Sequence, residues 1–348
     1  MIFFVDSPTS PDRLSSADFT MLWEHYHASK FLYPAKLERL QPLLSRIQEG
    51  WPLLMNAPAE LFQIHLAGAA GRIISSVCAF RDSPDTFVIQ HAVSQQHPLR
   101  MIDCLQSTTT AVSASSARFA AMFFRLENRW PIRLMRAIGE RYSPEHVDLR
   151  TQDYLVCRPF SNGTHAATTQ DFGNAFPPEA VEIAVAALGE LRAASYGADS
   201  GSDGFQRLRD ACSHRSLLRD RRIFGVFRDN ALAGFACCYM TGVPMNFSSL
   251  CGRVEFVLHP NSPDRASVVS ELARAAIHSA HSRGEQLLPA LVDPSDSPAA
   301  ASAGFTATDK QYSNFLWTRE GARGFASTSI ALSHWYGRIE RISATNGT

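Results

Sequence analysis

The sequence predicts an α+β fold made of two similar domains, each a mixed, mostly antiparallel sheet flanked by helices. Three observations predict it: strand and helix patterns alternate along the chain, the same order of elements occurs twice, and landmark residues recur at a nearly constant spacing. The offsets are 162, 159 and 161 positions for Phe62 and Phe224, Phe80 and Tyr239, and Tyr154 and Phe315. A constant offset over separate landmarks indicates a duplicated unit.

The first half begins with an apolar segment, residues 1–5, which we interpret as a strand. Two helices follow, and the second carries leucine and isoleucine at helical spacing between residues 37 and 47. A glycine-containing turn then joins two strands into a hairpin. The predicted order is helices 18–29 and 34–49, strands 61–66, 73–80 and 86–93, helix 99–114, strand 119–126, helix 130–141 and strand 147–157.

The second half repeats this order. Ser262, Pro263 and Asp264 predict a helix start, with a capping serine, proline at the first helical position and an acid in the first turn. Gly284 predicts the end of that helix. The predicted order is helices 178–196 and 205–218, strands 223–227, 232–239 and 254–260, helix 262–283, strand 287–292, a Gly-Phe turn at 303–305 and strand 312–318.

These patterns divide the chain into an N-terminal domain, 1–160, a linker, 161–178, a C-terminal domain, 179–320, and a tail, 321–348. The linker is rich in Ser, Asn, Gly, Thr and Pro. The tail contains one amphipathic stretch, 329–342, whose Trp335, Ile339 and Ile342 predict docking on a domain or on a second subunit, so a homodimer is possible.

Composition excludes several classes of protein. The 33 basic and 33 acidic residues balance, which argues against nucleic acid or an anionic membrane as the partner. No segment approaches the roughly 20 apolar residues of a membrane span. Seven cysteines without C-x-x-C spacing favour reduced core thiols in a cytoplasmic protein. His278 and His281 lie three positions apart on a helix, which favours a solvated helix face over a metal site, so we expect no metal.

The segment from Val254 to Trp317, with its strand, helix, strand, Gly-Phe turn and strand, resembles the GNAT superfamily of acyl-CoA-dependent acyltransferases. The family's cofactor loop, Q/R-x-x-G-x-G/A, lets backbone N–H groups approach a pyrophosphate. It falls on Pro263 to Val268 here, and on Gln96 to Met101 in the first half. Neither segment contains a glycine. The resemblance is therefore one of element order, without the family's intact phosphate-binding loop.

The resemblance implies an N-acyltransferase that moves an acetyl group from acetyl-CoA to a small-molecule or protein amine, with the second domain active and the first structural. Glu255 corresponds to the family's catalytic glutamate, and His259 is a second candidate base. The family's tyrosine acid falls on Ala300, so Tyr312 or Tyr239 would have to replace it; strand tyrosines are more often packing residues. The resemblance also implies cofactor contacts from the backbone of Val257 and Leu258, and from Arg265, Ala266 and Ser267 at the helix start.

A second hypothesis is a catalytically degenerate tandem that senses a ligand or binds a partner. The altered loops of both halves favour it, whereas the retained element order favours the enzyme only at the level of fold.

Overall fold

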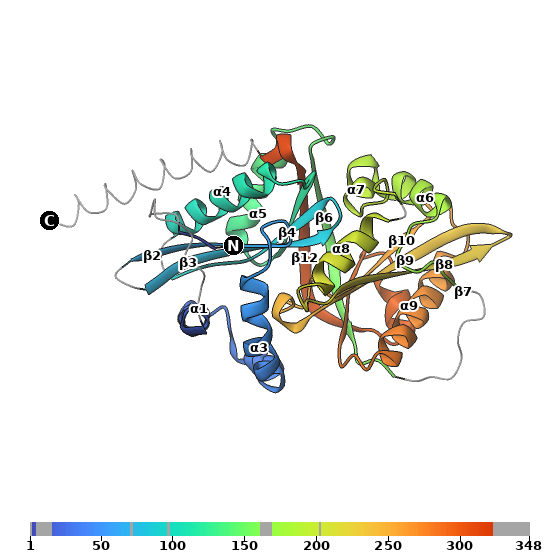
Figure 1. Ribbon diagram of the computed structural model, residues 1–348. Helices are drawn as coiled ribbons and strands as arrows, with labels where there is room; N and C mark the ends of the chain where they lie inside the picture. Colours follow the sequence, from blue (N-terminus) through green and yellow to red (C-terminus); the bar gives the residue numbers. More distant parts are fainter. Residues whose placement is uncertain are drawn as a thin grey trace.

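A computed structural model of the chain describes residues 2–4, 16–69, 72–95, 98–160, 169–201 and 203–322. Twelve strands of these residues form one continuous, mostly antiparallel sheet through the whole molecule (Figure 1), where the sequence predicted one sheet for each half. The strands are β1 (Ile2–Phe4), β2 (Phe62–Ala69), β3 (Arg72–Ser83), β4 (Thr86–Ser94), β5 (Phe119–Arg125), β6 (Val147–Cys157), β7 (Thr169–Asp171), β8 (Arg219–Arg228), β9 (Ala231–Thr241), β10 (Val254–Leu258), β11 (Leu288–Val292) and β12 (Thr306–Thr318).

The two halves of the chain contribute their strands to the sheet in the same pattern, counted from either edge. The strand order runs β1-β2-β3-β4-β5-β12-β6-β11-β10-β9-β8-β7, so each half contributes five strands and then meets the closing strand of the other half. β6 and β12 pair antiparallel at the centre, with Val147 opposite Trp317 and Val156 opposite Thr306. The last strand of each half is therefore exchanged into the other, which a pattern search along the chain does not predict.

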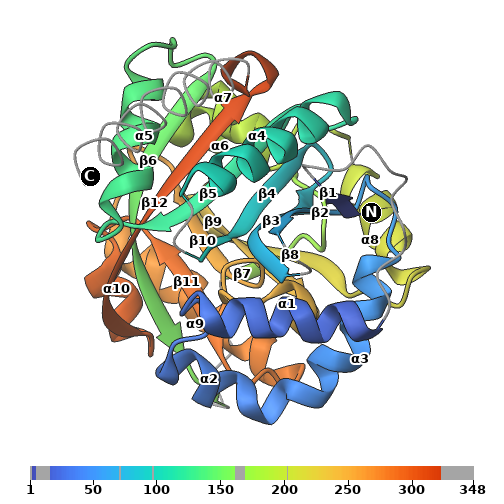
Figure 2. The ribbon, with the colours of Figure 1, turned by 90° about the vertical axis from the view of Figure 1, so that its left-hand side faces the viewer.

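Helices cover both faces of this sheet (Figures 1 and 2). One core crosses both halves and joins α1, α3, α6 and α8 to β2, β3, β8 and β9. On the other face, α4 and α5 cover the first half and α9 and α10 cover the second. The helices are α1 (Ser16–Ala28), α2 (Pro34–Leu40), α3 (Leu44–Met55), α4 (Pro98–Ala114), α5 (Arg129–Gly139), α6 (Pro178–Leu188), α7 (Glu190–Ser195), α8 (Gly204–Ser213), α9 (Arg265–Ser282) and α10 (Ser297–Ser302).

The cysteines follow the prediction. All seven are buried free thiols. Cys237 packs in the core shared by both halves, and its neighbour Cys238 packs beneath α9, because successive strand residues point to opposite faces.

The predicted start of the long helix is wrong. Ser262 does not cap it, because it lies three residues before the first helical residue, Arg265, and its hydroxyl donates to the Pro263 carbonyl at 3.3 Å. The N-cap residue is Asp264 in a left-handed conformation, with φ 55° and no side-chain capping bond. The first turn of α9 therefore contains no acid.

Other boundaries also differ from the prediction. Gly189, at φ 83°, divides the predicted helix 178–196 into α6 and α7. The short helix α10 was not predicted, and β12 begins six residues early because a bulge near Ala307 lets a polar segment pair with β6. Residues 169–171 of the predicted linker form β7. The predicted tail helix, 329–342, lies outside the described residues.

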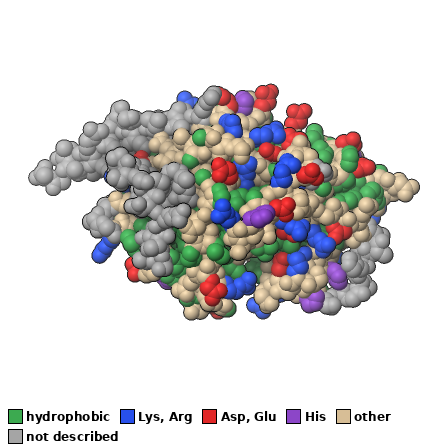
Figure 3. Space-filling model, in the orientation of Figure 1, with side chains coloured by type: hydrophobic (Ala, Val, Ile, Leu, Met, Phe, Trp, Pro, Cys, Tyr) green, Lys and Arg blue, Asp and Glu red, His purple; other side chains and the backbone are tan. Residues whose placement is uncertain are grey.

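The surface seen in Figure 3 mixes basic and acidic side chains, in keeping with the balanced composition. Among the helices that the structure describes, none combines the length and apolar character needed to cross a bilayer.

Candidate functional site

The candidate site is a pocket where two parallel strands separate. β4 and β5 pair from Thr86–Phe119 as far as Ile89–Met122 and then diverge. A cavity of about 630 Å³ lies at this divergence, which we call the first wedge. It is lined by apolar side chains of β4, β5, α4 and α5, including Met101 and Leu105 of α4. A cavity of this size accommodates a small molecule or part of a cofactor.

The second half of the chain completes the first wedge. Tyr312 and Lys310 reach it from β12, and Ser248 and Leu250 reach it from the loop between β9 and β10. The strand exchange causes this, because β12 lies directly beside β5, with Tyr312 opposite Arg125. The pocket is therefore built from both halves.

His91 forms part of the pocket wall at a bulge in β4. Two residues, His91 and Ala92, lie opposite the single residue Val77, and His91 has φ 52°, a conformation that is uncommon for a residue with a side chain. Its ring stacks on the Phe247 ring, with the two ring centroids 5.3 Å apart. Both ring nitrogens are buried without a hydrogen-bond partner in the described residues. Burial, reinforced by the nearby Lys36, lowers the pKa of His91 well below its ordinary value, so the ring is neutral.

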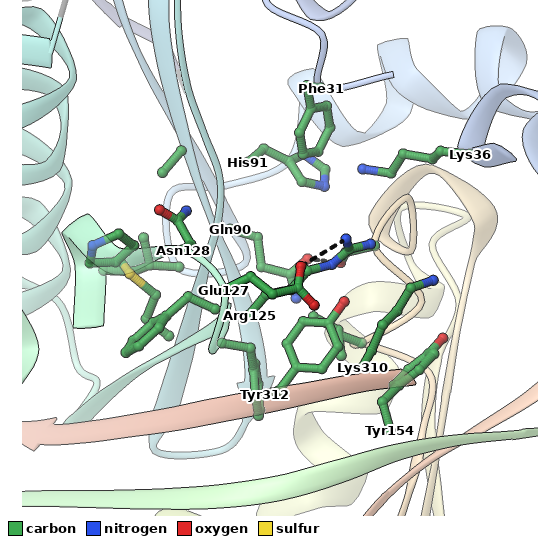
Figure 4. Close-up of a pocket in the computed structure, with 18 of the residues that line it drawn as sticks. Phe31, Lys36, Gln90, His91, Arg125, Glu127, Asn128, Tyr154, Lys310 and Tyr312 are labelled. Atoms are coloured by element: carbon green, nitrogen blue, oxygen red, sulfur yellow. Dashed lines mark hydrogen bonds and ion pairs between the residues drawn. The ribbon is translucent and has the colours of Figure 1, made fainter. Parts of the chain in front are cut away.

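Positive side chains gather around the pocket. The basic residues that line it are Lys30, Lys36, Lys310, Arg39 and Arg125, together with one carboxylate, Glu127. Figure 4 shows Lys36, Lys310, Arg125 and Glu127. The Arg125 guanidinium lies 3.8 Å from the Glu127 carboxylate and donates a 2.7 Å hydrogen bond to the hydroxyl of the pocket residue Tyr33. Arg39 is fixed by Ser249 and by the Phe247 carbonyl. The wedge therefore carries a net positive charge.

Tyr312, predicted as a catalytic residue, lies in this pocket. Its ring packs against that of Tyr154, with the two ring centroids 5.4 Å apart. Burial raises the pKa of Tyr312, while the hydrogen bond with Arg125 acts in the opposite direction. The phenol is therefore protonated near neutral pH and is placed beside a permanent cation.

Glu255, the predicted base, lies outside this pocket in a buried ionic network. Its carboxylate accepts hydrogen bonds from the Tyr196 hydroxyl and from Arg253 Nε. Arg253 and Arg219 also bind Asp82 of β3, at 3.1 and 2.8 Å. Burial alone would raise the pKa of Asp82, but the two guanidinium groups hold it below its usual value. The network joins the two halves of the chain, and the Phe123 ring lies beside both the network and the first wedge.

The other predicted residues lie around a second divergence. β10 and β11 pair at Val254–Ala290 and Glu255–Leu291 and then separate, which we call the second wedge. Val257 and Leu258 are buried beyond this point and pair with β9 alone. His259 follows them in a turn, where its Nδ1 accepts the Asn261 N–H at 3.2 Å.

The start of α9 is occupied by internal pairs. Arg265 makes two hydrogen bonds to Asp296, at 2.6 and 2.7 Å. Ser267 donates to Glu271 at 3.0 Å, and Ala266 is exposed. Arg265 and Ser267 already have partners, so neither side chain is free to bind a phosphate without giving up a contact.

Sequence reasoning missed Lys36, His91 and Arg125, because all three lie in the half that it assigned a structural role. One signal was present: the chain has only three lysines against thirty arginines, and all three lysines line the first wedge. The structure describes no group of three or more His, Cys, Asp or Glu side chains able to hold a metal ion.

No family model and no curated protein sequence matches the chain. Solved structures similar to it include a tandem GNAT protein from the clavulanic acid biosynthesis pathway, without acetyl-CoA. That protein is 15% identical over 78% of this chain and 88% of its own, with a TM-score of 0.44.

Two further similar structures are putative acetyltransferases. One, from Pyrococcus horikoshii, is 11% identical over 90% of this chain and 92% of its own, with a TM-score of 0.42. The other, of the GNAT family from Novosphingobium aromaticivorans, is 13% identical over 70% and 88%, with a TM-score of 0.37. The chain is thus similar to tandem GNAT and GNAT-family acetyltransferases.

Proposed function

We propose that this protein is an acyl-CoA-dependent N-acyltransferase built from two tandem GNAT-like domains. The observation that carries the proposal is the first wedge, a pocket of about 630 Å³ where β4 and β5 diverge, with the phenol of Tyr312 on its wall. A thioester seated between the diverging strands would present its carbonyl to an amine that enters past the positively charged rim.

The proposed chemistry is direct attack of an amine on the thioester carbonyl. Glu127, the carboxylate of the pocket, takes the proton of the incoming ammonium group through solvent, and Tyr312 donates its proton to the departing thiolate. Arg125 lies beside both groups, so it holds the carboxylate near the phenol and stabilises negative charge that develops there.

The second wedge supplies an alternative position for the same reaction. There Glu255 would be the base, with His259 in reserve, and the acyl-CoA would lie along Val257 and Leu258 and at Arg265, Ala266 and Ser267. The buried pairs of Glu255 with Tyr196 and Arg253 favour a structural role for this carboxylate, because proton transfer would first require these bonds to break.

Release of CoA thiol from acetyl-CoA, measured with a panel of amines, tests the proposal. We expect turnover with at least one amine, and loss of turnover in Glu127→Gln with the acetyl-CoA affinity retained. Loss of turnover in Glu255→Gln with normal folding, and none in Glu127→Gln, would move the reaction to the second wedge. Binding of acetyl-CoA without release under any condition would leave a ligand-binding protein, and the enzyme proposal would fail.

A further inference from the structure

Lysine is nearly absent from this chain except around the first wedge. Thirty of its 33 basic residues are arginine, yet Lys30, Lys36 and Lys310 all line the one pocket. Arginine stays charged in proteins, whereas lysine can lose its proton when it is buried and then becomes a nucleophile. The wedge is therefore where the chain retains the side chain that can act as a free amine.

Lys36 is the buried member of this set. It lies on α2 with 5% of its surface exposed, and its Nζ lies 3.3 Å from the centre of the Phe31 ring. In Figure 4 the amine points toward His91 within the pocket. By contrast, Lys30 is exposed and Lys310 is half-buried.

The charges around Lys36 disfavour its protonated form. In the part of the chain that the structure describes, no carboxylate pairs with its amine, and the charged groups that act on it are Arg39 and Arg125. Burial, followed by repulsion from these two guanidinium groups, lowers the pKa of Lys36 well below its ordinary value. The contact with the Phe31 face favours the cation, but a cation–π contact contributes only about 2 kcal/mol in a desolvated site.

We propose that Lys36 is a covalent acyl acceptor, taking an acyl group from a thioester bound in the first wedge. The lone pair of neutral Nζ attacks the thioester carbonyl carbon and a tetrahedral intermediate forms. The carbon–sulfur bond then breaks, the thiolate leaves, and it takes up the proton that the nitrogen loses. The products are an amide on Lys36 and a free thiol, with no oxidant or reductant required.

This inference rests on the proposed function only in that an acyl thioester enters the wedge. It adds a modification that the transfer to an external amine does not need. The amide is uncharged and remains beside Phe31 and His91, so acylation prevents this position from taking up a proton and fills part of the pocket.

The test is mass-spectrometric peptide mapping of the full-length protein after incubation with acetyl-CoA and, separately, with the acetyl thioester of N-acetylcysteamine. The second donor is small and uncharged and needs no recognition of CoA. We expect Lys36 to be acetylated by at least one donor, at least about tenfold faster than Lys30 or Lys310, which serve as controls in the same pocket. The rate at Lys36 should also level off at a lower pH than at Lys30.

Two variants test whether acetylation depends on the amine of Lys36 and on the charge of Arg125. Lys36→Met keeps the length of the uncharged side chain and cannot form the amide, so acetylation at this position should be lost while the fold remains. Arg125→Gln removes a repelling cation, so labelling of Lys36 near neutral pH should slow. Equal labelling of the three lysines, or no labelling of Lys36 by either donor, would overturn the proposal.

The outcomes separate this proposal from the proposed function. Labelling by the small thioester alone, without CoA release from acetyl-CoA, would support Lys36 as the acceptor while the acyl-CoA-dependent function fails. Acyl transfer to free amines with an unmodified Lys36 would support the function and overturn this inference.

Discussion

The first and second wedges have the same topology and different electrostatics. In each, a parallel strand pair separates after a few residues, at Ile89–Met122 in the first and at Glu255–Leu291 in the second. Around the second wedge, acids and bases neutralise one another, as in Glu255 with Arg253 and Arg265 with Asp296. Around the first wedge, five basic side chains and a single carboxylate line the cavity.

This difference teaches that a repeated fold does not imply a repeated site. The strand divergence follows from topology and is present in both halves. Whether it forms a site depends on which side chains remain unpaired. Buried charges that pair internally serve structure, whereas a surplus of basic side chains over carboxylates around a cavity leaves binding energy for a ligand.

Breaking the neutralised network should have the largest effect. Asp82→Asn leaves Arg219 and Arg253, both buried, short of a counter-charge. We expect a loss of about 3–5 kcal/mol in the free energy of unfolding. Denaturant titration measures it, with Asp199→Asn as the control, because the Arg118–Asp199 pair is nearly half exposed on both sides and should cost about 1 kcal/mol or less. Equal effects of the two changes would contradict the description of this network.

Removing the phenol from the first wedge should affect catalysis without affecting folding. Tyr312→Phe deletes one hydroxyl and keeps the ring that packs on Tyr154. We expect kcat to fall by about 100-fold, with the KM for acetyl-CoA little changed, because the proton donor acts on the leaving group. Tyr142→Phe is the control, because Tyr142 packs against the core beneath α4 and α5 and does not line the pocket. An unchanged kcat would remove Tyr312 from the mechanism.

Acid should destabilise the first half through its buried histidines. Burial lowers the pKa of His25 to about 4 and of His65 to about 3. The unfolded chain takes up these protons below about pH 6.5 and the folded chain does not, so stability is lost as the pH falls. Each of the two histidines should lower the free energy of unfolding by about 2 kcal/mol between pH 7 and pH 5. Urea titrations at both pH values should give a smaller difference for His65→Gln than for the parent, and an equal difference would refute the assignment.

The smallest effect should come from the start of α9. Arg265 is 42% exposed but its partner Asp296 is buried, so Arg265→Ala should cost about 1–2 kcal/mol of stability through the two hydrogen bonds that Asp296 loses. If acyl-CoA binds in the first wedge, its affinity measured by calorimetry should not change. A fall of tenfold or more in this affinity would place the acyl-CoA phosphates at the start of α9. The second wedge, and not the first, would then be the binding site.

Sequence patterns predicted most elements, because strands and helices repeat their apolar residues with distinct periods. The bounds of β6 and the burial of the seven cysteines as free thiols are examples. The joining of the sheets and the exchange of β6 with β12 were not predictable in this way. They depend on contacts between residues about 160 positions apart, such as Val147 with Trp317, which leave no local pattern.

The candidate site was predicted only in part. Tyr312 was selected as a replacement acid, but its partners lie in the other half of the chain, so its pocket could not be inferred. Glu255 was selected as the base, but nothing in its local sequence indicates that it is buried and held by Tyr196 and Arg253. Burial of a charged residue is decided by such distant partners, which the local sequence does not specify.

The exchange of closing strands also affects synthesis of the protein. β5 ends at Arg125, but its central neighbour β12 is complete only at Thr318. At roughly 5–20 residues per second, the ribosome needs about ten to forty seconds to make the intervening chain. During that time one edge of β5 has no partner strand, and unpaired edges invite pairing with other chains. The nascent first half therefore faces an interval of exposure to aggregation that a domain with its own closing strand avoids.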